Sequence, residues 1–276
     1  MKTLILKFAF FLAFTLSLAS NSYAVPVLQV GAPAGSGDIG SYADYQLSLT
    51  NPSEENTAVT FGNTLYVGGV YQNSQVLSLG GSYSFDSVTG PDWSSFSVDS
   101  VKLPTAFDTR GAILVASVPN GMEITASASL NVGGSLAFFS SGENSYFPET
   151  HAPVSPTVAD FLFFDIGNFD DIASAVAVPD FATEADAAPG VLKALTFIGF
   201  ESLPWIHFDV MALQTSNSPG EEIDTILVGN PISYDVIWKN TSPVTPVPEP
   251  ATLGLLAAGL GGLGLFGRRR LKVLKA

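Results

Sequence analysis

Histidine and cysteine supply much of the catalytic and metal-binding chemistry of proteins, and this chain is poor in both. It contains two histidines, His151 and His207, and no cysteine, which excludes disulfides, thiolate metal sites, cysteine nucleophiles and zinc motifs of the HExxH kind. His207 and Asp209 are two residues apart, so on a strand they share a face, where the carboxylate could orient the imidazole for base catalysis. No GxSxG elbow supplies a nucleophilic serine. We therefore interpret His207 as a solvated histidine on the face of a strand.

A group of oxygen-bearing side chains follows a predicted strand and offers the hard ligands that Ca²⁺ favours. Its members are Asp165, Asn168, Asp170 and Asp171. Their spacing does not match an EF-hand loop, although further oxygen ligands can come from distant loops. The sequence therefore offers a candidate Ca²⁺ site at these residues, although an ordinary acidic turn is favoured, and it indicates no other cofactor.

Three tryptophans, Trp93, Trp205 and Trp238, could form an apolar platform for sugar rings. Aromatic side chains in a β-sandwich more often belong to the core, because each of them buries a large apolar area. The sequence favours the core interpretation and leaves the sugar platform as the alternative.

Charge is sparse in this chain and strongly biased toward acid. Charged residues make up 13% of the sequence, and 25 acidic residues against 11 basic ones give a net charge of −14. The segment between residues 25 and 249 contains four basic residues and all 25 acidic residues, so it carries a net charge of −21. The four are Lys102, Arg110, Lys193 and Lys239. Because binding to nucleic acid needs clustered Lys and Arg, we expect no nucleic-acid partner.

The first 24 residues have the three parts of a secretory signal peptide. Lys2 and Lys7 supply the positive charge, an apolar run extends from Phe8 to Leu18, and the small-x-Ala sequence Ser22-Tyr23-Ala24 follows. We expect cleavage between Ala24 and Val25 and export of the remaining chain.

The segment between residues 25 and 240 has the pattern of an all-β protein. Apolar and polar residues alternate most regularly over Met122–Val132, which predicts a half-buried strand, and continuous apolar runs such as Phe161–Ile166 fit strands covered on both faces. Gly- and Pro-containing turn signals separate these runs. We predict an antiparallel β-sandwich, jelly-roll or immunoglobulin-like. Residues 147–156, with three prolines, are a possible internal boundary, although one continuous sandwich is favoured.

After residue 240 the composition changes three times. Residues 241–250 contain four prolines, which predicts an extended stalk. Residues 251–267 are 17 uncharged, mostly Leu, Gly and Ala residues, and as a helix they would span about 25 Å, near the short limit for crossing a membrane. Arg268, Arg269 and Arg270 open a basic tail, 268–276, that should stay on the cytoplasmic side and leave the body outside.

These last residues resemble the PEP-CTERM sorting signal of Gram-negative bacteria. The resemblance covers about the last 30 residues and rests on Val247-Pro248-Glu249-Pro250, the short Gly/Leu span and the cluster Arg268–Arg270. It implies that a membrane-embedded exosortase recognises Pro248, Glu249 and Pro250 and removes the tail, while Arg268–Arg270 stop translocation. It also implies an inner-membrane-anchored precursor whose body is then transferred to the cell surface or to the exopolysaccharide matrix of a biofilm.

A second, shorter resemblance concerns the body. The segments Phe147–Pro153 and Trp205–Val210 are similar to segments of choice-of-anchor surface proteins, which carry interchangeable C-terminal anchors. From these patterns we expect a structural or adhesive protein of the surface or exopolysaccharide layer, without enzymatic activity. A carbohydrate-binding module and a secreted hydrolase with paired carboxylates in a cleft remain as alternatives.

Overall fold

The computed structural model describes residues 25–32, 39–40, 57–70, 76–85, 88–98, 100–142, 146–147, 159–181, 186–217, 223–231 and 234–240. All of them fall in one compact unit that ends at Asn240. No helix among these residues is long and apolar enough to cross a membrane. The predicted signal peptide, stalk, span at 251–267 and basic tail lie outside the described residues, as do His151 and most of the possible boundary at 147–156.

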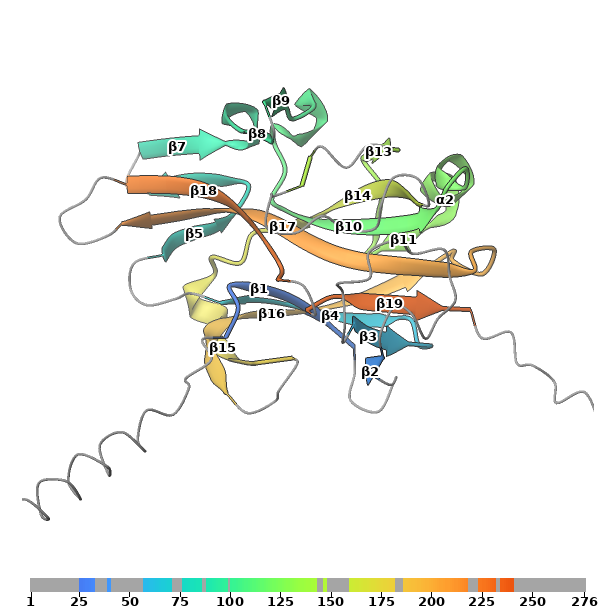
Figure 1. Ribbon diagram of the computed structural model, residues 1–276. Coiled ribbons are helices and arrows are strands. Elements are labelled where there is room, and N and C mark those ends of the chain that lie inside the picture. Colours follow the sequence, from blue (N-terminus) through green and yellow to red (C-terminus); the bar gives the residue numbers. More distant parts are fainter. Residues whose placement is uncertain are drawn as a thin grey trace, which may run out of the picture. The chain divides into compact units, whose positions relative to one another are not determined.

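Strands dominate this unit, which confirms the predicted all-β class, and they form two large sheets and two separate hairpins (Figure 1). The first sheet has the order β1 (Leu28–Gly31), β4 (Thr64–Val70), β16 (Ala187–Ile198), β11 (Asn131–Val132) and β12 (Ser135–Leu136), with β15 (Val176–Pro179) paired to β16. All of its ladders are antiparallel.

The second sheet is built around β17, its longest strand. Its order is β13 (Phe139–Ser141), β14 (Ala159–Gly167), β10 (Ala112–Pro119), β17 (Trp205–Asn217), β19 (Val236–Lys239), β3 (Thr57–Thr60) and β2 (Ile39–Gly40), with β18 (Ile223–Gly229) and β5 (Val76–Gly80) also paired to β17. The first half of β17 lies between β10 and β19, and its second half lies between β5 and β18. The ladder between β19 and β3 is parallel, unlike its neighbours.

Short elements complete the described part of the chain. They are the hairpins β6 (Ser82–Phe85) with β7 (Val88–Asp92) and β8 (Ser97–Val98) with β9 (Val101–Lys102), the 3-10 turns η3 (Trp93–Ser95), η4 (Thr105–Phe107) and η5 (Ile172–Ser174), and the helix α2 (Glu123–Ser129).

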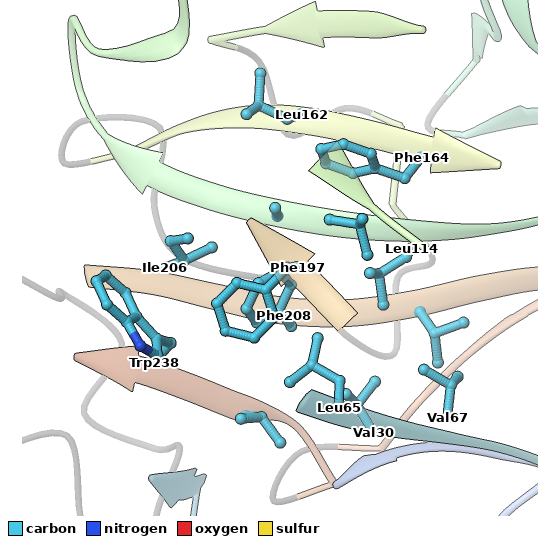
Figure 2. Packing of buried hydrophobic residues seen from close by; sticks show 14 of the residues in the cluster. Val30, Leu65, Val67, Leu114, Leu162, Phe164, Phe197, Ile206, Phe208 and Trp238 are labelled. Atoms are coloured by element: carbon cyan, nitrogen blue, oxygen red, sulfur yellow. The ribbon is translucent and has the colours of Figure 1, made fainter. Parts of the chain in front are cut away.

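The main core lies between the two sheets. Alternate residues of β10 and β17, such as Leu114 and Phe208, point toward Leu65 and Val67 of β4 (Figure 2). These side chains are fully buried, and each contributes about 1.5–3 kcal/mol relative to an exposed position. The arrangement confirms the predicted sandwich, because each sheet buries one face against the other.

A second core covers the opposite face of the second sheet. Trp93 of η3 and Phe107 of η4 lie against Phe161 and Phe163 of β14, together with Met211 of β17. The central strands of this sheet are therefore buried on both faces. This explains why residues 161–164 form a continuous apolar run rather than an alternating one.

The alternation over Met122–Val132 predicts a strand, and this prediction is wrong for residues 123–129, which form the helix α2. Ala126 and Leu130 are buried and Met122 is partly buried, and residues four apart line one face of a helix. Four of the seven residues of α2 are Ala or Ser, small side chains that fit a helix as well as a strand, and alanine has the highest helix propensity. The spacing of Met122, Ala126 and Leu130 therefore fits one face of a helix as well as one face of a strand.

The second core predicts a large effect of one substitution. The ring of Phe107 makes edge contacts with Trp93, Phe138, Phe139 and Phe163 at centroid distances between 5.1 and 6.2 Å. We expect Phe107→Ala to lower the free energy of unfolding by about 3–5 kcal/mol, measured by chemical denaturation of the purified protein.

The matched control for Phe107→Ala is Phe61→Ala, because the Phe61 side chain is 50% exposed. We expect the control to change the free energy of unfolding by less than about 0.5 kcal/mol. Equal effects of the two substitutions would mean that the second core does not stabilise the sheet.

Candidate functional site

The chemistry-bearing residues of the body gather on the second sheet, where β17 passes between β10 and β19. His207 and Asp209 share one face of β17, as their spacing predicted, while Ile206 and Phe208 point into the main core on the other. The register places Ser117 of β10 opposite His207 on one side and Ile237 of β19 opposite it on the other.

His207 lies between two carboxylates. Its Nδ1 is 2.9 Å from Oδ2 of Asp209, and its Nε2 is 3.2 Å from Oδ2 of Asp235, which directly precedes β19. The amide Nδ2 of Asn230 donates to Oδ1 of Asp209 at 3.2 Å, and its Oδ1 accepts the backbone N–H of Val210 at 2.7 Å. We name His207, Asp209, Asp235 and Asn230 the Asp–His–Asp cluster.

The prediction of a solvated His207 is wrong, since its side chain is 0% exposed. Alternation along β17 shows which residues share a face, but it does not show that this face is covered. Asp235 and Asn230 were missed for a related reason: strand pairing between distant segments brings Asp235 to His207 and Asn230 to Asp209. Asp235 and Ile237 are two residues apart and so share a face of a strand, but this spacing does not show which strand lies beside them.

The two carboxylates set the charge of His207. Burial alone would lower the pKa of the imidazole, but the negative charges of Asp209 and Asp235 outweigh it and hold the pKa well above the ordinary 6.5. The imidazole is therefore a cation at neutral pH. Removing one partner of such a buried pair leaves a charge without a counter-charge, which costs about 3–5 kcal/mol.

The Asp–His–Asp cluster also has the donor types of a metal site. One ligand atom from each of His207, Asp209 and Asp235 lies within 4.8 Å of the other two. The imidazole ring, however, lies between the carboxylates, and each ring nitrogen faces a different one. A metal ion would need one nitrogen of a neutral imidazole with both carboxylates converging on it, so the geometry favours a protonated ring.

The predicted Ca²⁺ ligands make contacts with separate partners. Asp165 Oδ1 accepts the backbone N–H groups of Gly111 and Gly167 at 3.1 and 2.9 Å. Asn168 Oδ1 accepts the N–H of Gly81 at 3.1 Å, and Asn168 Nδ2 donates to Oδ2 of Asp170 at 3.4 Å. These bonds join the turn after β14 to the starts of β10 and β6.

Asp171 and two basic side chains complete this acidic turn. Asp171 accepts from Ala173 N and Ser174 Oγ at the start of η5. Arg110 Nη1 lies 3.9 Å from Oδ2 of Asp165, and Lys193 Nζ donates to the carbonyl of Ile166 and lies 4.6 Å from the centroid of the Phe169 ring. These contacts favour the alternative, an ordinary acidic turn with its own counter-charges, and Ca²⁺ binding itself is left to a titration experiment.

The three tryptophans lie in the cores. Trp93, Trp205 and Trp238 are 0%, 5% and 3% exposed, and Trp93 Nε1 donates to the carbonyl of Gly111 at 2.9 Å. Figure 2 shows Trp238 beside Ile206 in the main core. The core interpretation is therefore confirmed for all three.

The raised pKa of His207 predicts a loss of stability at alkaline pH. Because the folded-state pKa lies above the unfolded value of 6.5, the contribution of the cluster is complete below about pH 6.5 and is lost as the pH rises through the folded-state pKa. In a His151→Gln variant the remaining imidazole belongs to His207, and we expect its NMR signal to titrate well above pH 6.5. Titration near pH 6.5 would contradict the ion-pair geometry.

The charges around the acidic turn make a prediction about Ca²⁺. Arg110 and Lys193 already supply positive charge there, so we expect calorimetric titration of the purified protein with millimolar Ca²⁺ to give no heat above buffer. Heat that disappears in Asp170→Asn, but persists in the exposed control Asp224→Asn, would establish the metal site instead.

The sorting signal lies outside the described residues, and comparison with known families identifies it. A family model for the PEP-CTERM protein-sorting motif matches residues 246–270, which include Val247–Pro250 and Arg268–Arg270. No curated protein and no solved structure matches the chain. The motif indicates an exported protein that is anchored transiently in the membrane and processed by an exosortase-type enzyme. The chain is thus a protein that carries a PEP-CTERM sorting domain.

Proposed function

We propose that the body is a structural or adhesive component of the cell surface or exopolysaccharide matrix, without enzymatic activity. The sorting motif supports an extracellular destination. The net charge of −21 between residues 25 and 249 supports a highly hydrated, anionic surface that resists non-specific association.

The observation that carries this proposal is the burial of the Asp–His–Asp cluster. Its histidine and carboxylates have the chemistry of a general base, yet their side chains are between 0% and 3% exposed. A general base must come within about 3 Å of the proton it removes, so a substrate would have to enter the sheet. The cluster therefore supports a role in holding strands together.

A second acidic pair bears on the hydrolase alternative. Asp160 and Glu123 interact directly: burial and the hydrogen bond with Glu123 raise the pKa of Asp160, while that hydrogen bond lowers the pKa of Glu123. Glycosidases separate their two carboxyl groups by about 5 Å or more to leave room for the sugar. A directly bonded pair leaves no such room, which supports the non-enzymatic proposal.

The carbohydrate-binding alternative loses its main support. It required an exposed row of aromatic rings, whereas the three tryptophans lie in the cores. Adhesion would then depend on polar or aliphatic surface contacts rather than on stacking with sugar rings.

Cell fractionation tests the proposed destination. In cells that contain the processing enzyme, we expect a surface or matrix form whose termini, mapped by mass spectrometry, lack the signal peptide and the residues after the Pro-Glu-Pro motif. In cells without the enzyme, we expect the intact tail in the membrane fraction.

The two matched substitutions for this experiment each replace a glutamate with alanine. We expect Glu249→Ala, within the motif, to trap the chain in the membrane fraction, and Glu201→Ala, on the exposed surface of the body, to leave sorting unchanged. A matrix that keeps its cohesion and adhesion when the correctly sorted protein is deleted would exclude the structural role.

A further inference from the structure

The last strand of the body, β19, has four residues, yet contacts fasten it at both ends. At its start, Asp235 lies 3.2 Å from Nε2 of His207, and the carbonyl of Tyr234 accepts the backbone N–H of Val30 at 2.9 Å. These contacts join the start of β19 to β17 and to β1, which belongs to the other sheet.

At the other end of β19, Asn240 makes three hydrogen bonds to one turn. Its backbone N–H donates to the carbonyl of Pro204 at 3.0 Å, and its side-chain Nδ2 donates to the carbonyls of Glu201 and Leu203 at 3.2 and 3.4 Å. Between the two ends, the ring of Trp238 packs against Phe200 at a centroid distance of 4.6 Å.

The direction of β19 determines the order in which a pull on the tail reaches these contacts. β19 is antiparallel to β17, and Lys239 is paired with Trp205. The chain leaves β19 through Asn240 toward the stalk and the sorting motif at 246–270. Tension from an anchored tail therefore acts first on Asn240, and it reaches the pair Lys239–Trp205 before the pairs farther back along β19.

We propose that the contacts of Asn240 and the Asp235–His207 ion pair form a clamp that keeps β19 in the sheet while the membrane-anchored tail is under tension. Asn240 takes the load first, because it is the last body residue before the stalk. The ion pair limits any opening that passes Trp238, because separating Asp235 from His207 leaves both charges without their partner. The proposal depends on the sorting motif and not on the matrix role of the body.

Single-molecule pulling tests the clamp on the full chain in detergent. Because the chain has no cysteine, Asn120→Cys and Ser242→Cys provide two unique attachment points, one at an exposed residue after β10 and one just after the body. We expect Asn240→Ala to raise the rate of the first opening step at fixed force by about tenfold, as the loss of one or two hydrogen bonds would. We expect Asp235→Asn to leave that first step unchanged and to raise the rate of the next step, the opening that passes Trp238, by about tenfold or more. The control Asn63→Ala, at another exposed asparagine, should leave the rate unchanged.

Hydrogen exchange distinguishes a clamp on β19 from a general effect on the fold. In Asn240→Ala, which removes an exposed side chain, we expect faster exchange at residues 236–239 and unchanged exchange at residues 161–164 of β14. Unchanged opening rates in both variants would overturn the proposal. Exchange that rises equally in β14 and β19 would also overturn it, because the contacts would then stabilise the whole sandwich.

Discussion

The electrostatic balance of one buried imidazolium constrains this body more than any other single contact. His207 brings a positive charge into a sheet whose central strands are buried on both faces, and it is tolerated there because Asp209 and Asp235 face its two nitrogens. Since the carboxylates come from β17 and from the residue before β19, the two segments cannot separate without exposing or uncoupling charge. Asn230 extends the same constraint to the end of β18.

The rest of the second sheet is arranged around the strand that carries this histidine. β17 pairs with four strands, two along each half, and its core face meets the first sheet. On its other face, His207 and Asp209 in the first half are followed by Met211 and Leu213, which belong to the second core. One strand thus joins an ion-paired region to an aromatic one.

Sequence patterns sufficed for the fold class but only for part of the site. The all-β sandwich followed from short apolar segments and turn signals, and the shared face of His207 and Asp209 followed from their spacing. Spacing does not show whether a face is covered: farther along the same face, Met211 and Leu213 pack in one cluster with Trp93 and Phe107, which lie far away in sequence. Asp235 reaches His207 through a strand pairing that no local pattern contains. The helix at 123–129 was missed because small residues fit a period of two as well as a period of four. The sorting motif could be identified without knowledge of the fold, because it is a contiguous stretch of the sequence.

The position of β19 between β17 and β3 also orders the assembly of the sheet during export. Among the described strands, β3 and β2 join the second sheet only through β19, the last strand of the body to be synthesised. The second sheet therefore stays incomplete until residues 236–239 have crossed the membrane. The native state of the body therefore cannot close before nearly all of its residues have been delivered.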